Sequence, residues 1–427
     1  MSAFENNFGK ISATSFKEIL LPKCGYKRDE VLTGPKFGVD TAIIDLGNGK
    51  AMAVSSDPLS LIPSLGLKES AWLSVHLLAN DMATTGFAPQ FAQFVLNLPV
   101  SLSTADFQEY WHYIHIFCDE IGVAITGGHT GQIEGQNSTI SGGGTMFLTA
   151  PKNKILTSNN AEIGNIIVVT KESALSSTAI LAKSFPETVI KQLGKEIYKQ
   201  SEANFYQTSS LKEALLAAKI LKPNDELKAM HDVTEGGLIG AISEVAQASG
   251  CGFKIENEKI PVGEAQKQIS ELFKIDHRFS IGAGSMIMIV KKGVEQKLIN
   301  HLYENGIKAT AVGEITPKSS GFKIVEKGTE KEIDFDGTDP LVRGPVNTTR
   351  FIAAASSYYC VKVLVANEAS VNEGFFRPIR VKVPPNCLLD AQGRQVPVVG
   401  GNHETSQRIV DAVFKALAPA FPERIVA

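Results

Sequence analysis

The segment AMHDVTEGGLIGAISEVAQASG, residues 229–250, constrains the fold of this chain more than any other stretch. Four apolar residues recur at helical spacing and form one face of a predicted helix: Leu238, Ile242, Val245 and Ala246. Gly250 stands where this helix should end. Five residues that suit a binding site come directly before the helix: Asp232, Thr234, Glu235, Gly236 and Gly237. Paired glycines at a helix start bare the N–H groups of the first turn, where the dipole favours anions. The alternative is that the acidic residues only stabilise their own helix.

A second glycine-rich stretch, AITGGHTGQIEG at residues 124–135, follows an apolar run. Its four glycines predict a loop whose backbone comes close to another group, and glycines let backbone N–H groups approach phosphate oxygens. His129 lies between these glycines. Three roles remain open for it: a donor to a phosphate, an acid or base near neutral pH, or a side chain that simply packs at the loop.

Hairpin and helix signals organise the first third of the chain. Residues 41–58 predict a β-hairpin, because Asn48-Gly49 lies between two apolar strands. A helix is expected in residues 70–89 with Ser70 as its N-cap, and a second helix follows a capping pair that begins at Ser103.

Three aspartates lie at or near the ends of these elements. Asp40 stands just before the hairpin, Asp57 follows its second strand, and Asp81 lies on the next helix beside Asn80. Each alone suits a cap or a turn. Carboxylates that converge repel one another, and a hard divalent cation such as Mg²⁺ removes that cost while it bridges to phosphates. Together with the glycine-rich segments, they predict a metal–nucleotide site.

Composition excludes several classes of protein. A chain of 427 residues predicts two or three domains, and a formal charge of −3 without a basic block argues against a nucleic acid or a membrane surface as partner. We expect no signal peptide, because the first ten residues carry Glu5 and no apolar core. We expect no membrane-spanning segment, because no apolar run approaches the roughly 20 residues that a span needs. Five scattered cysteines favour free thiols in a reducing cytoplasm and argue against structural zinc.

Five motifs together resemble the aminoimidazole ribonucleotide (AIR) synthase superfamily, which includes AIR synthase, HypE, thiamine-monophosphate kinase and selenide, water dikinase. HDVTEGGLIGAISEVAQASG is similar to the D-x-T-E-G-G-L segment of this superfamily. The other four motifs are GVDTAIIDL, SSDP, ANDMATTGFAP and GGHTG, in the order of the superfamily and over roughly residues 8–330.

The resemblance implies an α+β fold with two domains, a homodimer formed through the N-terminal sheets, and ATP with Mg²⁺ between the domains. It makes four aspartates candidate magnesium ligands: Asp40, Asp57, Asp81 and Asp232. Candidate nucleotide-binding residues are Gly127, Gly128, Thr130, Gly236, Gly237 and Asn80. The candidate catalytic residues are His129, Asp232 and Glu235. Two positions depart from the superfamily pattern, because Val39 and His129 stand where carboxylates are expected. The lack of a C-terminal cysteine argues against HypE-type cyanyl transfer, and the N-terminal glycine-rich segment lacks the cysteine of selenide chemistry.

The last part of the chain resembles a piece of the hydantoinase B / 5-oxoprolinase family. DFDGTDPLVRGPVN, NEGFFRPIR and GGNHETSQR carry this similarity. We therefore expect three parts, at residues 1–155, 156–333 and 334–427, the last a small α+β tail joined by natural fusion or by joined reading frames. An amphipathic helix near the C-terminus carries Ile409, Val413, Phe414 and Leu417 on one side. We expect this stripe to lack a partner in the chain, because the rest of that family's much larger proteins is not recognisable here.

These observations predict an ATP- and Mg²⁺-dependent enzyme that activates or phosphorylates a small acid, amide or alcohol. Such an enzyme is a phosphotransferase or an ATP-driven dehydratase or ligase, since phosphoryl transfer needs positioning and charge neutralisation more than a nucleophilic side chain. Two alternatives stay open. The tail favours a ring-amide hydrolase component of the hydantoinase or 5-oxoprolinase type, while the two departures favour a non-catalytic ATP-binding scaffold or maturation partner.

Overall fold

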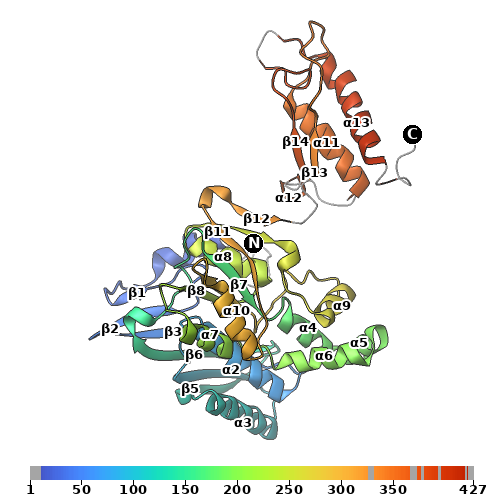
Figure 1. The fold of residues 1–427 in the computed structure, drawn as a ribbon. Coiled ribbons are helices and arrows are strands. Elements are labelled where there is room, and N and C mark those ends of the chain that lie inside the picture. Colours follow the sequence, from blue (N-terminus) through green and yellow to red (C-terminus); the bar gives the residue numbers. More distant parts are fainter. Residues whose placement is uncertain are drawn as a thin grey trace. The chain divides into compact units, whose positions relative to one another are not determined.

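The computed structural model of the protein describes residues 11–325, 331–365, 373–376, 379–392, 396–418 and 421. The chain forms two compact units, residues 1–324 and 325–427, and each is described by itself. In the first unit two six-stranded sheets are each packed against helices (Figure 1). The expected α+β fold is confirmed, whereas the expected boundary between residues 155 and 156 remains a prediction. No helix in the described ranges is long and apolar enough to cross a membrane.

The first sheet has the strand order β1-β2-β3-β6-β4-β5. Its strands are β1 (Val31–Thr33), β2 (Ala42–Gly47), β3 (Lys50–Ser60), β4 (Phe91–Pro99), β5 (Ala124–Ile133) and β6 (Ile140–Pro151). Only the β4–β5 ladder among them is parallel. Two helices, α2 (Leu67–Ala83) and α3 (Thr104–Glu120), cover one face, where Phe94 and Leu96 of β4 pack with Leu78 and Ile114. A short α1 (Ala13–Ser15) precedes the sheet.

The predicted hairpin is confirmed. Asn48 and Gly49 both have positive φ, of 49° and 73°, as a tight turn between twisted strands requires. The second strand is longer than expected: β3 continues to Ser60, so Asp57 lies inside the strand and pairs with Gly144 of β6.

Two capping predictions have opposite outcomes. Ser103 caps α3 as expected, because its hydroxyl accepts from the backbone N–H of Asp106. Ser70 is not the N-cap of α2, which begins at Leu67 after Gly66. The buried Ser70 hydroxyl instead donates to the Gly66 carbonyl and accepts from the N–H of Ile62, which ties the incoming chain to the first turn.

The prediction of a glycine-rich loop at residues 124–135 is wrong, because the stretch forms strand β5 beside β4. The close approach inferred from its glycines does occur, since a Cβ atom on Gly128 would overlap the carbonyl oxygen of Phe94. Gly128 also has a φ of 147°, which other residues rarely adopt. Gly128 therefore allows a parallel strand to lie against β4.

The second sheet has the strand order β12-β9-β11-β7-β10-β8. Its strands are β7 (Ile166–Thr170), β8 (Leu227–Asp232), β9 (Gly252–Glu256), β10 (Met286–Val290), β11 (Ala309–Thr316) and β12 (Phe322–Val325). The helices of this half are α4 (Leu175–Ser184), α5 (Pro186–Leu193), α6 (Lys195–Phe205), α7 (Leu211–Ile220), α8 (Gly237–Ala248), α9 (Glu264–Leu272) and α10 (Glu295–Glu304). The predicted apolar face of α8 is confirmed, because Leu238, Ile242, Val245 and Ala246 are all buried in one core cluster.

The C-terminal unit has its own small core. Strand β13 (Lys331–Asp334) pairs in parallel with β14 (Ile379–Lys382), and the helices are α11 (Arg350–Val365), α12 (Glu373–Phe376) and α13 (Glu404–Leu417). Ile409 and Val413 of α13 are buried with Cys360 of α11 and Leu389. The amphipathic helix is thus confirmed, but the expectation that its stripe lacks a partner is wrong: α11 and the loop after β14 cover it.

Candidate metal and phosphate site

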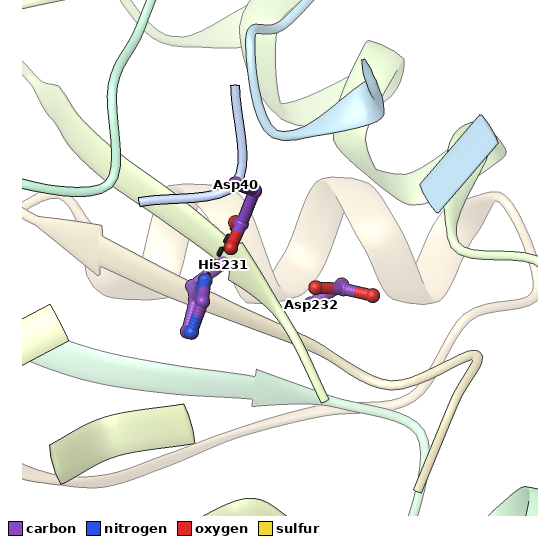
Figure 2. Close-up of side chains that lie close together, drawn as sticks. All are labelled: Asp40, His231 and Asp232. Carbon is purple, nitrogen blue, oxygen red and sulfur yellow. Dashed lines mark hydrogen bonds and ion pairs between the residues drawn. The ribbon is translucent and has the colours of Figure 1, made fainter. Parts of the chain in front are cut away.

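Three side chains from distant parts of the chain meet in the first unit (Figure 2). Asp40 lies just before β2, whereas His231 and Asp232 are the last two residues of β8. One potential ligand atom from each residue lies within 4.8 Å of the others. Among the residues that the structure describes, these three form the group of His, Cys, Asp and Glu side chains that could hold a metal ion.

His231 links two carboxylates. Its Nδ1 lies 2.5 Å from Oδ2 of Asp40, and its Nε2 lies 3.0 Å from Oε2 of Glu244 on α8. Burial alone would lower the pKa of His231, but the carboxylates of Asp40, Glu244 and Asp232 outweigh burial and raise the pKa to about 10. The ring is therefore an imidazolium near neutral pH, and both of its nitrogens donate.

Both ring nitrogens of His231 already contact carboxylates, so the carboxylate oxygens are the ligand atoms that remain for a cation. Ser158 also supports Asp40, because its Oγ lies 3.0 Å from Oδ2 of Asp40 and 3.0 Å from the carbonyl oxygen of Met230.

The other two predicted aspartates converge on the same place. The pKa of the buried Asp81 carboxyl is raised well above its usual 3.8. Burial is the largest cause, followed by the charges of Asp232, Asp57 and Asp40. A hydrogen bond of 2.7 Å from Ser55 Oγ to Asp81 Oδ2 acts in the opposite direction. Three carboxylates thus lie within electrostatic range of Asp81, and a bound divalent cation would relieve the repulsion.

The residues expected to contact phosphate lie on two elements. Gly127, Gly128, His129 and Thr130 are exposed in β5, the last strand at one edge of the first sheet. Glu235 and Gly236 are exposed in the turn before α8. Gly237 is buried, because residues 278–280 pack closely against it. Val39, the other departure from the superfamily pattern, is half-buried before Asp40.

Asn80 is buried, and both its amide nitrogen and its amide oxygen form hydrogen bonds within the protein. Its Nδ2 donates to the Thr208 carbonyl at 2.9 Å, and its Oδ1 accepts from the N–H of Ser210 at 2.7 Å. These bonds fix α2 to the segment before α7. Its expected contact with a nucleotide stays a prediction.

Sequence reasoning missed four residues of this site: Ser55, Ser158, His231 and Glu244. A signal existed for two of them. His231 directly precedes a candidate ligand, and Glu244 is a charge within the apolar run of a buried helix. Ser55 and Ser158 carry no comparable signal, because their roles depend on how β3 meets α2 and how residue 158 meets β8.

Three family models match the chain. The N-terminal domain of AIR synthase related proteins matches residues 38–147, and the C-terminal domain of the same proteins matches residues 162–326. The hydantoinase B/oxoprolinase model matches residues 298–427 and overlaps the second match.

Curated relatives divide along the same line. A putative hydrogenase expression/formation protein of Methanocaldococcus jannaschii is 24% identical over 273 residues, which are 64% of this chain and 77% of the relative. The 5-oxoprolinase of Saccharomyces cerevisiae is 38% identical over 89 residues, 20% of this chain but only 7% of the relative. An uncharacterized protein of Schizosaccharomyces pombe is 37% identical over 103 residues, 24% of this chain and 8% of the relative. The tail thus spans a small fraction of the proteins it resembles.

Solved structures match the first unit. The hydrogenase maturation protein HypE in complex with ATP has a TM-score of 0.55 at 16% identity, and the match covers 73% of this chain and 88% of HypE. A ThiL protein complexed with AMPPCP and TMP has a TM-score of 0.55 at 16% identity, covering 69% of this chain and 89% of ThiL. At these identities the likeness concerns the fold. The two matching domain models show that this chain belongs, over residues 38–147 and 162–326, to the AIR synthase-related superfamily, and its C-terminal part matches the hydantoinase B model.

Proposed function

We propose that the first unit is an ATP- and Mg²⁺-dependent enzyme that activates or phosphorylates a small acid, amide or alcohol. The observation that carries this proposal is the buried Asp81 carboxyl, which lies among Asp40, Asp57 and Asp232. A protein keeps such a cluster at a cost in stability, and functional sites are where such costs are found.

The donor set fits magnesium. Mg²⁺ takes oxygen ligands and usually keeps several waters while one or two carboxylates and the substrate phosphates complete its shell. Asp40, Asp57, Asp81 and Asp232 offer carboxylate oxygens, and His231 is occupied by Asp40 and Glu244. Bound Mg²⁺ would neutralise phosphate charge, and the four aspartates would hold it.

The nucleotide part of the proposal has support from relatives. HypE has been solved in complex with ATP and a ThiL protein with AMPPCP, and both share this fold. We assign phosphate contacts to Gly127, Gly128, Thr130, Gly236 and Gly237, and a further contact to Asn80. His129, Asp232 and Glu235 are the candidates to contact the reacting groups.

The reaction class follows from these parts. Phosphoryl transfer depends on positioning and electrostatic stabilisation. A phosphotransferase, or a dehydratase or ligase driven by ATP, therefore needs no further nucleophile from the chain. The acceptor is a small molecule.

We propose that the active form is a homodimer in the cytoplasm. Phe91 and Val95 point away from α2 and α3 and stay 36% and 41% exposed on the open face of the first sheet. A second copy of this chain is the occupant that the superfamily resemblance implies for this face. All five cysteines are free thiols, which suits a reducing compartment.

A second candidate function rests on the tail. The match to 5-oxoprolinase favours a component of a ring-amide hydrolase, although the chain spans 7% of that relative. A non-catalytic ATP-binding scaffold is the third possibility, since Val39 and His129 replace expected carboxylates.

Release of ADP from Mg-ATP by the purified full chain, screened against small acids, amides and alcohols, tests the proposal. Saturation at a hundred times the dissociation constant should stabilise the native state by about 2.7 kcal/mol and raise the melting temperature. EDTA should abolish both effects. An unchanged melting temperature with millimolar Mg-ATP would refute the site, binding without turnover would favour the scaffold, and ATP-driven hydrolysis of 5-oxoproline or hydantoin would favour the second candidate.

A further inference from the structure

The segment that carries Asp40 is fastened to the second half of the first unit at three points. Lys36 donates through Nζ to the carbonyl oxygen of Ala248, the last residue of α8, at 2.6 Å. Gly38 lies against the same helix, because a Cβ atom there would come within 2.6 Å of the Glu244 carbonyl oxygen. The third point is the bond between Asp40 and His231. Residues 36–40 therefore run along α8 towards β8.

Of these three contacts, the bond between Asp40 and His231 is the one that lies in the carboxylate site. The His231 side chain is 1% exposed, and its two nitrogens contact Glu244 on α8 and Asp40. Asp40 precedes His231 by 191 residues in the chain. Asp40 faces the charges of Asp232 and Asp81, so repulsion works to move it outwards. The hydrogen bond between Nδ1 of His231 and Oδ2 of Asp40 opposes that movement.

We propose that His231 is a positioning residue: it holds Asp40 in the carboxylate site and keeps residues 36–40 closed on α8, while Glu244 orients its ring. The consequence for ATP turnover rests on the proposed function, but the effect on residues 36–40 does not.

Two substitutions separate the two bonds of His231. In His231→Asn the amide nitrogen takes the place of Nδ1, so the bond to Asp40 is kept and the bond to Glu244 is lost. In His231→Gln the amide nitrogen takes the place of Nε2, so the bond to Glu244 is kept and the bond to Asp40 is lost. Both variants are neutral, so any difference between them reflects geometry and not charge.

Hydrogen exchange of the amides of residues 36–40 in the metal-free full chain is the first measurement. The N–H of Val39 donates to the Lys36 carbonyl at 3.2 Å and reports on the closed segment. We expect His231→Gln to increase the exchange rate about fivefold, which corresponds to the loss of one hydrogen bond. His231→Asn should leave the exchange rate within about twofold of the wild type. The same pair of substitutions at the exposed His115 of α3 controls for general effects.

The second measurement is the Mg²⁺ concentration that gives half-maximal ATP turnover. It should rise about fivefold in His231→Gln and change less in His231→Asn, with kcat affected less than the Mg²⁺ requirement. Equal exchange in the two variants would overturn the proposal, and so would different exchange with an equal Mg²⁺ requirement. A wild-type protein without ATP turnover would refute the proposed function alone, because the exchange experiment would still show whether His231 holds the segment.

Discussion

Ser55 of β3 donates its hydroxyl to Oδ2 of Asp81 on α2 at a distance of 2.7 Å. This bond lowers the pKa of Asp81, but burial and the neighbouring carboxylates raise it by more. A single neutral donor therefore does not balance the charge of the site. Removing a charge from this site should therefore raise the stability of the protein and lower its activity.

Asp81→Asn should stabilise the metal-free protein and inactivate it. The neutral amide can still accept the Ser55 bond while it removes repulsion with three carboxylates, so we expect the free energy of unfolding to rise by about 1 kcal/mol. ATP turnover should fall at least about tenfold, which corresponds to about 1.4 kcal/mol in the barrier. Asp57→Asn should act in the same way and more weakly. Urea unfolding with EDTA and ADP release measure the two effects.

Asp119→Asn is the matched control, since this carboxylate is exposed at the end of α3. It should change neither quantity. Full turnover in both site variants would return Asp57 and Asp81 to the class of structural residues.

His76 should make the stability of the protein fall below neutral pH. Its ring is 4% exposed and packs at a tilt against Trp72 with centroids 3.7 Å apart, and neither ring nitrogen has a hydrogen-bond partner within the described residues. Burial, with the charge of Lys171, lowers the pKa of His76 from 6.5 to about 3. The unfolded chain therefore binds a proton from pH 6.5 downwards, whereas the folded chain does not until about pH 3.

The stability that wild-type His76 contributes is thus complete above pH 6.5 and is lost as the pH falls towards 3. Between pH 7 and pH 5 the wild type should lose about 2 kcal/mol relative to His76→Leu. Urea unfolding of both proteins at the two pH values checks this, with His115→Leu on the exposed surface of α3 as control. A constant difference between wild type and His76→Leu would show that the ring is solvated or hydrogen-bonded in solution.

Gly128→Ala should disrupt the first sheet, because the new methyl group would overlap the Phe94 carbonyl of β4. We expect a loss of more than about 3 kcal/mol in the free energy of unfolding, or an insoluble protein. Gly131→Ala in the same strand is the control: its Cβ atom would meet nothing closer than the His129 ring at 3.7 Å, and it should fold normally. Equal stability of both variants would refute the claim that position 128 requires glycine.

The open face of the first sheet should hold a homodimer together. Phe91→Asp combined with Val95→Asp places two charges on this face and should halve the mass of the particle, from twice 45.9 kDa to 45.9 kDa, in light scattering. Tyr303→Asp on α10, where the side chain is 75% exposed, should leave the dimer intact. A wild-type protein that is already a monomer contradicts the prediction.

Local signals in the sequence were enough for much of the fold. The Asn48-Gly49 turn, the capping Ser103 and the apolar face of α8 each depend on neighbours within a few residues, and the structure confirms all three. A strand is predicted at residues 123–126, but its continuation through the glycines to Ile133 is not, because glycines suggest loops unless the partner strand is known. Only the position of Phe94 shows why Gly128 is needed there.

The candidate site divides in the same way. The aspartates at positions 40, 57, 81 and 232 can be named as candidates because carboxylates near the predicted ends of elements are visible in a sequence, although Asp57 lies inside β3. The link from Glu244 through His231 to Asp40 was not found, since it depends on the packing of a loop against a helix some 200 residues later. Distances of that kind follow from tertiary structure and leave no pattern in one sequence.

The C-terminal unit should be dispensable for the ATP site. Every residue assigned to metal or nucleotide lies between positions 40 and 237, and the C-terminal unit buries Ile409 and Val413 in its own core. A chain that stops after Val325 keeps β12 and the whole second sheet, whereas a later stop would leave β13 without β14. We expect this truncated protein to stay soluble and to bind Mg-ATP within about twofold of the full chain, measured by thermal shift.

A chain that stops after Glu304 is the control for this truncation. It lacks β11, which lies between β9 and β7 in the sheet order, so its loss exposes the edges of two strands and the core cluster that contains Val312 and Ile315. This shorter chain should be insoluble. If the chain that stops after Val325 also precipitates or loses Mg-ATP binding, the first unit depends on the hydantoinase B-like unit. If it behaves as expected, the two units are independent folds on one chain, and the activity of each can be sought separately.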